Sequence, residues 1–150
     1  MRVFSGLDEF TAAVGEHLGY SEWHTITQER VRLFADATDD HQWIHLDTER
    51  AAKGPFGGTI AHGYLTLSLI PMFGPEIYRV DNLTMGVNYG LNKARFPQAV
   101  RVGAKIRAGG ELLEATDVPG GKQVVVRWTI EIDGEAKPAC VAETVARLIA

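Results

Sequence analysis

The sequence predicts an α+β fold in which helical segments come first and antiparallel strands follow. Residues 59–70 are apolar on nearly every face, which is typical of a buried helix. From residue 82 onward the apolar residues recur at every second position, which indicates half-buried strands. Helices that are segregated from antiparallel strands define the α+β class. One apolar helix beside a sheet with one apolar face indicates that the sheet wraps around the helix.

Short helices are predicted to precede this central helix. Apolar residues at helical spacing place them at 7–18, 28–37 and 48–53, with an extended stretch at 20–26. Thr27 and Asp47 are expected to cap the second and third helices, and Gly54 to end the third. Trp43 and the turn residues before it favour an ordered loop over 38–45 rather than a helix. Pro71 is expected to end or kink the central helix.

The second half of the chain is predicted to be an antiparallel meander. Turn residues separate the strands, and they fall at Phe96-Pro97, Gly109-Gly110, Pro119-Gly120-Gly121 and Asp133-Gly134. The predicted strands are 83–91, 100–108, 123–132 and 138–149. No linker, repeat or low-complexity segment divides the chain, so a single domain is expected over residues 1–150.

Composition limits the class of protein. With 45% hydrophobic and 23% charged residues, the chain of 150 residues has the composition of a typical globular protein. Its net charge of −4 gives no indication of nucleic-acid binding. A single cysteine, Cys140, excludes a disulfide framework or a cysteine-rich zinc site within one chain, and the expected compartment is the cytoplasm. No signal peptide or membrane span is expected.

Residues 38–45 are the strongest candidate site, because they bring two carboxylates and two imidazoles into eight residues. Asp40 and His45 are one loop apart, and such a pair can hold a water and move its protons. The simpler alternative is that an aspartate caps a turn and His45 merely packs at an interface. A metal site on His41, His45 and His62 is a weaker alternative, so neither a metal nor a cofactor is expected.

Two further groups could bind parts of a substrate. His62-Gly63 lies near the start of the buried helix, where the Gly63 N–H could donate to a developing oxyanion; alternatively, Gly63 allows close packing. No acidic residue occurs between Asp81 and Glu111, and Arg101, Lys105 and Arg107 are expected to share one face of a strand. This basic interval suits a phosphorylated ligand, although a solvated outer face of the sheet is the commoner explanation. It contains Lys93, Arg95, Arg101, Lys105 and Arg107.

Two motifs resemble the MaoC-like (R)-specific enoyl-CoA hydratase family, of the actinobacterial single-domain type. The motifs are Phe34-Ala35-x-x-Thr38-x-Asp40-x-x-x-Ile44-His45-x-Asp47-x-x-x-Ala51 and Phe56-Gly57-x-x-Ile60-Ala61-His62-Gly63. The resemblance covers roughly residues 25–149 and implies the hotdog fold, a curved antiparallel sheet around a long central helix. The family usually has Gly-Asp-x-Asn-Pro before the histidine. Here Gln42 can donate and accept as Asn would, and Trp43 in place of Pro is expected to influence substrate choice.

The resemblance implies syn addition of water to trans-2-enoyl-CoA, giving (R)-3-hydroxyacyl-CoA, or the reverse dehydration. Asp40 and His45 would be the catalytic pair and Gly63 the oxyanion donor, with His62 and Gln42 as further substrate-binding residues. Lys93, Arg95, Lys105 and Arg107 would contact the CoA phosphates, and the acyl tail would run along Tyr64 and Leu67. A homodimer is expected, without membrane or nucleic-acid partners. The alternatives are an acyl-CoA thioesterase and a noncatalytic acyl-binding module on the same fold.

Overall fold

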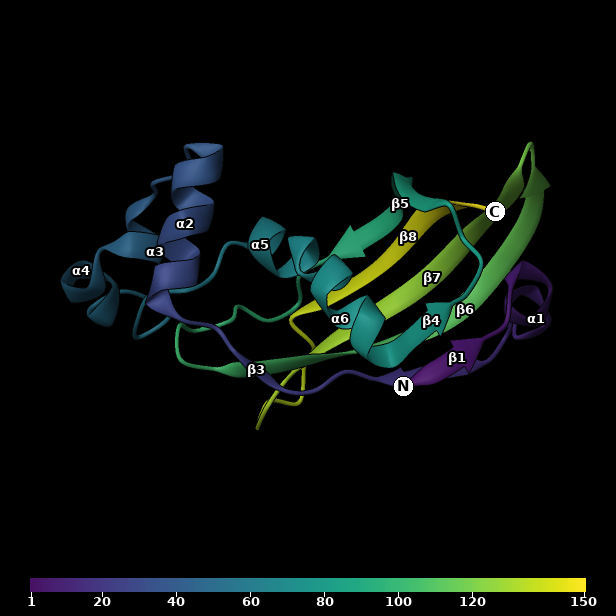
Figure 1. The fold of residues 1–150 in the computed structure, drawn as a ribbon. Coiled ribbons are helices and arrows are strands. Elements are labelled where there is room, and N and C mark those ends of the chain that lie inside the picture. The colour runs from purple at the N-terminus through teal and green to yellow at the C-terminus, as the bar shows by residue number, and fades with distance from the viewer.

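A curved antiparallel sheet wraps around two consecutive helices in the computed structural model, which describes residues 1–150. The strand order is β2-β6-β7-β8-β5, with β3 paired to β6. Helices α5 (Gly63–Ser68) and α6 (Ile70–Ile77) lie against the concave side of this sheet (Figure 1). The strands are β2 (His17–Tyr20), β3 (His24–Thr25), β5 (Met85–Arg95), β6 (Lys105–Val118), β7 (Gly121–Ile132) and β8 (Cys140–Ile149). The predicted α+β architecture is confirmed.

The central helix starts later than the sequence predicted and is broken once. Residues 59–62 are extended instead, because the Ile60 N–H donates to the Ile44 carbonyl and the Ala61 N–H donates to the Val100 carbonyl. The helix breaks at Leu69, and Pro71 lies in the first turn of α6, where a missing N–H leaves no bond unmade. The expected interruption near Pro71 is therefore confirmed, and Pro71 itself lies at the start of the second half of the helix.

The predicted strand 100–108 is confirmed only from Lys105 onward, and the predicted turn at Gly109-Gly110 is wrong. Arg101 makes an isolated β-bridge with Ile60 and Gly103 turns the chain at φ +96°, whereas β6 runs straight through Gly109 and Gly110. Gly110 lies directly opposite Trp128, and a Cβ there would come 3.3 Å from the indole ring. These glycines make room for aromatic rings from neighbouring strands rather than forming a turn. The predicted turn at Pro119-Gly120-Gly121 does connect β6 to β7.

Strand β5 is at the edge of the sheet, which differs from the predicted meander. Strands β6, β7 and β8 follow one another in space as they do in sequence, but β5 pairs with β8. Residues 96–104 therefore cross from one side of the sheet to the other. A separate parallel pair, β1 (Arg2–Phe4) with β4 (Tyr78–Val80), was not predicted. Helix α1 (Leu7–Ala12) ends before the predicted residue 18 because β2 begins at His17.

One hydrophobic core lies between the central helices and the sheet. Alternate residues of β7 supply much of it, and the Phe73 side chain of α6 is fully buried among them. Those β7 residues are Val124, Val126, Trp128, Ile130 and Ile132. Buried Cys140 has a thiol pKa raised to about 11 by desolvation, which agrees with its predicted inertness. None of the helices has both the length and the apolar composition needed to cross a lipid bilayer.

Three helices form a cluster beyond one end of the sheet: α2 (Gln28–Thr38), α3 (Trp43–Leu46) and α4 (Thr48–Ala52) (Figure 1). Thr27 and Asp47 cap α2 and α4 as predicted, each accepting a hydrogen bond from a backbone N–H three residues on. The short α3 differs from the predicted loop. Trp43, which favoured that loop, instead packs against Arg50 and Gly54 and so fixes α3 against α4.

Candidate active site

The end of α2 places Asp40 beside the start of the central helix. Asp39 adopts φ +59°, a left-handed conformation that aspartate tolerates better than most residues, and it turns the chain out of the helix. The backbone carbonyl of Asp40 then accepts a 3.0 Å hydrogen bond from His62 Nε2–H. The Asp40 side chain remains 49% exposed. The carboxylate is thus held at a fixed point while its oxygens stay accessible to water.

His45 is buried on α3 with one ring nitrogen already engaged. Its Nδ1–H donates to the Ile60 carbonyl over 2.7 Å, because that oxygen can only accept. This assigns the lone pair of the neutral ring to Nε2. Burial lowers the pKa of His45 below its usual value, with the Ile60 hydrogen bond opposing the shift. His45 is therefore a neutral imidazole whose Nε2 can accept a proton.

His62 stacks on His45 and connects it to Asp40. The two ring centroids are 3.7 Å apart with 22° between the planes, and the ring of Phe34 packs against His62 at 4.9 Å. Only 3% of His62 is exposed, and its Nδ1 is buried without a hydrogen-bond partner. Since its Nε2–H is engaged by the Asp40 carbonyl, this side chain faces the protein rather than the solvent.

Asp40, His45 and His62 offer side-chain atoms that lie within 4.8 Å of one another. A tetrahedral metal requires lone pairs that converge on one point. The lone pairs of the two stacked imidazoles lie in nearly parallel planes that are about one ring thickness apart, and each ring already donates one N–H to a backbone carbonyl. The arrangement suits proton transfer between Asp40, His45 and a small molecule better than it suits metal coordination.

Gly63 starts α5 beside this cluster. The first N–H groups of a helix have no intrahelical acceptor, so the Gly63 N–H is available to a ligand oxygen. A Cβ at this position would come 3.1 Å from the ring of Phe96, so a larger residue would push that ring away. The close packing considered from the sequence is therefore real. It does not exclude the role in binding.

The remaining loop residues lie apart from the cluster. His41 is exposed and pairs with Asp36 at 2.9 Å, an interaction that raises its pKa. The side chain of Gln42 is exposed and makes no hydrogen bond within the chain, while its backbone N–H donates to the Asp40 carboxylate at 3.4 Å. Trp43, expected to influence substrate choice, is held between α3 and α4 by its contact with Arg50.

The four predicted phosphate ligands do not form one patch on the chain. Lys93 and Arg95 are on β5, whereas Lys105 and Arg107 are on β6, and β7 and β8 lie between the two strands. Three strand spacings separate them by roughly 14 Å. Arg107 is also occupied, since it pairs with Glu131 at 2.8 Å and stacks on Tyr20 and Trp23. The predicted shared face with Arg101 is wrong too, because Arg101 precedes β6 and its guanidinium donates to the Gly57 carbonyl.

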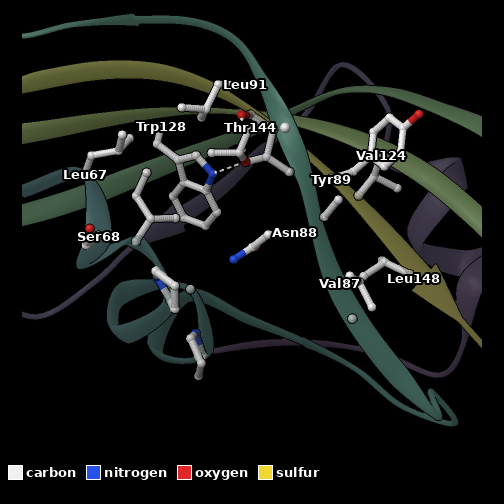
Figure 2. Close-up of a pocket in the computed structure, with 18 of the residues that line it drawn as sticks. Leu67, Ser68, Val87, Asn88, Tyr89, Leu91, Val124, Trp128, Thr144 and Leu148 are labelled. Carbon is white, nitrogen blue, oxygen red and sulfur yellow. Dashed lines mark hydrogen bonds between the residues drawn. The ribbon is translucent and has the colours of Figure 1, made fainter. Parts of the chain in front are cut away.

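A pocket of about 700 Å³ opens between α5, α6 and the inner face of the sheet. Figure 2 shows it bounded by Leu67 and Ser68 on α5, by β5, and by Trp128 at its inner wall. Leu67 was predicted to contact an acyl tail and does line the pocket. Tyr64 does not line it, because its side chain points outward and is 72% exposed. No sequence motif indicated Trp128 or Asn88 as lining residues.

Comparisons with known proteins agree with this fold. The family model described as MaoC like domain matches residues 9–134. The chain is 53% identical to 3-hydroxyacyl-thioester dehydratase Z of Mycobacterium tuberculosis strain H37Rv, over the full length of both proteins. It is 44% identical to nodulation protein N of Rhizobium leguminosarum bv. viciae, covering 91% of this chain and 86% of that protein. The chain therefore belongs to the MaoC-like family.

Solved structures show the same fold at low sequence identity. A monoamine oxidase regulatory protein from Archaeoglobus fulgius is 24% identical with a TM-score of 0.79, covering 99% of this chain and 96% of that one. An R-hydratase from Pseudomonas aeruginosa is also 24% identical, with a TM-score of 0.73, covering 91% of this chain and 81% of that one. Together with the full-length dehydratase relative, the family identifies the chain as a hydro-lyase enzyme. A noncatalytic module is thereby excluded.

Proposed function

We propose that the chain catalyses the reversible addition of water to a trans-2-enoyl-CoA, giving an (R)-3-hydroxyacyl-CoA. The observation that carries this proposal is the convergence of the Asp40 carboxylate and the His45 imidazole beside the first N–H of α5. The names of the relatives support it, since one is a 3-hydroxyacyl-thioester dehydratase and a structural neighbour is an R-hydratase. Asp40 and His45 are the proposed catalytic residues.

In the hydration direction, a water molecule binds between Asp40 and His45. The Asp40 carboxylate accepts one of its hydrogens and orients its oxygen. His45 Nε2 accepts the other proton as the oxygen attacks C3 of the enoyl group. Because the lowered pKa keeps His45 neutral, this nitrogen is ready to accept a proton near neutral pH.

The Gly63 N–H stabilises the negative charge that develops as the double bond is attacked. Attack at C3 moves that pair through C2 toward the thioester oxygen, and the resulting enolate oxygen accepts a hydrogen bond from the Gly63 N–H. Protonated His45, or Asp40 after proton exchange within the pair, then returns a proton to C2. The water hydroxyl ends on C3 and its proton on C2, so the pair returns to its starting state. Dehydration follows the same steps in reverse.

The residues around Gly63 indicate where the acyl tail and the CoA phosphates of the substrate bind. The pocket that starts at Leu67 and Ser68 follows Gly63 along α5 and receives the acyl tail. Lys93 and Arg95 are exposed at the same end of β5 as Phe96, whose ring contacts Gly63, so these two cations are the better candidates for the CoA phosphates.

Neutralising both Lys93 and Arg95 with Gln should raise KM in steady-state assays with little change in kcat. An unchanged KM would show that the two side chains are solvated and do not contact the CoA phosphates.

We also propose a homodimer formed through β5. Every residue of this edge strand except Ala94 is exposed, and its unpaired backbone edge would otherwise be open to aggregation. Large apolar side chains follow the strand at 47–60% exposure, which is unusual for a surface that stays in water. They are Met85, Val87, Tyr89 and Leu91. A second copy pairing along β5 would cover this edge and narrow the mouth of the pocket.

An assay with crotonyl-CoA tests the proposed reaction. The protein should remove the enoyl absorbance without releasing free thiol, and chiral analysis should find the (R)-3-hydroxybutyryl product. Thiol release would instead indicate a thioesterase. Formation of the (S) product would contradict the proposed placement of the water and of the thioester relative to α5.

A further inference from the structure

The pocket beside the active site is mostly apolar, and three of its polar side chains are already hydrogen-bonded. On α5, the Ser68 hydroxyl donates to the Tyr64 carbonyl at 2.6 Å. On β8, the Thr144 hydroxyl accepts a 2.9 Å hydrogen bond from the Trp128 indole N–H, drawn dashed in Figure 2. Neither group needs a hydrogen bond from a ligand. The polar groups that remain therefore indicate what the pocket recognises.

Asn88 is a polar side chain of the pocket without a partner. Its register opposite Ala146 places it on the inner face of the sheet, and Figure 2 shows its amide pointing into the pocket toward Trp128. Asn88 is exposed in the single chain, and its amide, which can donate twice and accept twice, makes no hydrogen bond within that chain. Gly86 and Gly90, two residues before and after Asn88 on β5, carry no side chain that could hydrogen-bond to its amide.

Tyr78 also lines this pocket. Its ring is stacked on Phe10 at 5.2 Å and on Trp128 at 6.4 Å, so its position is fixed by packing. Its hydroxyl makes no hydrogen bond within the chain. Burial raises the pKa of this phenol to about 12, so it stays a neutral O–H donor at every pH where the enzyme would work.

We propose that this pocket takes an acyl tail that carries a hydrogen-bonding oxygen, a hydroxyl or a carbonyl, and that Asn88 and Tyr78 determine this specificity. The proposal rests on the proposed function, because the tail reaches the pocket only when the thioester binds at Gly63. Ser68 lies five residues after Gly63, roughly 7.5 Å along the helix, so the polar atom belongs to the distal part of the tail rather than to the reacting carbons.

The physical reason is the cost of burying an amide without a partner. A plain hydrocarbon tail that fills the pocket displaces water from Asn88 and has no atom that can hydrogen-bond to the amide. A tail oxygen restores the lost hydrogen bond. One such bond is enough to change kcat/KM by about tenfold between otherwise matched tails.

The test compares trans-2-octenoyl-CoA with derivatives that carry one hydroxyl or keto group on the distal tail. The wild type should favour at least one oxygenated tail about tenfold in kcat/KM. Asn88→Leu should remove or reverse that preference, and Tyr78→Phe should reduce it. Asn92→Leu is the matched control, since it makes the same change on the same strand outside the pocket, and it should keep the preference. Each rate is divided by the variant's own rate with crotonyl-CoA, which lacks the distal tail that the proposal places beside Asn88.

Failure of this inference is distinguishable from failure of the proposed function. If crotonyl-CoA is hydrated but the wild type favours the hydrocarbon tail, the polar pocket is refuted and the reaction stands. The polar pocket is also refuted if Asn88→Leu retains the preference, as it would if the amide bonded to a second copy of the chain. The wild-type comparison decides even if a variant does not fold. Absence of crotonyl-CoA hydration would overturn the proposed function itself.

Discussion

At the scale of single residues, one hydrogen bond decides the chemistry available to His45. Donation from Nδ1 to the Ile60 carbonyl leaves Nε2 as the basic atom, and burial keeps that nitrogen unprotonated. The sequence already indicated Asp40 and His45, because they are close in the chain. It could not indicate the stacking of His62 on His45, since that contact depends on α3 and the residues before α5, which meet only in the folded protein.

The acid side of the pH–rate profile should show which histidine acts as the base. The folded-state pKa of His45 lies below 6.5, so His45 stays neutral and active as the pH falls through 6.5 and loses activity only below it. A profile of kcat/KM with crotonyl-CoA should therefore have its acid midpoint below pH 6.5. His41 has a raised pKa, so a midpoint above 6.5 that disappears in His41→Gln would show that His41, and not His45, is the base.

At the scale of elements, helix boundaries bring the site together. The cap of α2 at Thr27 and the left-handed residue Asp39 at its other end fix where Asp40 lies, and the extended residues 59–62 bring His62 and Gly63 next to it. Side-chain capping could be predicted from the sequence because it is local. The late start of α5 could not, since the hydrogen bonds of Ile60 and Ala61 come from residues 16 to 39 positions away.

The Thr27 cap provides a test of this dependence on α2. The Thr27 hydroxyl accepts from the Arg30 N–H at 3.2 Å. Replacing Thr27 with Ala should reduce the free energy of unfolding by about 1 kcal/mol in urea titrations. Thr27→Ser keeps the hydroxyl and should lose much less. Equal losses in the two variants would mean that the methyl group, and not the cap, supplies the stability.

At the scale of the whole molecule, β5 is the strand whose exposed edge and apolar side chains most need a partner. The period-two pattern predicted this strand from sequence, yet its place at the edge beside β8 follows from a long crossover that local patterns do not encode. The same placement separated Lys93 and Arg95 from Lys105 and Arg107. The exposed apolar side chains of β5 are accounted for if a second copy covers them.

A charge on this edge should separate the copies. Val87→Glu introduces a carboxylate at the proposed interface, and light scattering during size exclusion should show the wild type as a dimer and the variant as a smaller species. Val3→Glu, on β1, is the control, because Val3 is similarly exposed at 43% but lies outside the six-stranded sheet. A monomeric wild type, or dissociation caused equally by both changes, would argue against β5 as the interface.

The most direct measurement of the central claim, that Asp40 and His45 act together on one water, is a double-mutant cycle in crotonyl-CoA hydration. Asp40→Asn and His45→Gln should each lower kcat/KM by at least ~10²-fold, and the double variant should lose little more than the worse single one, because the two residues form one unit. Hydration that survives both substitutions undiminished, or losses that multiply as for independent sites, would contradict this joint action.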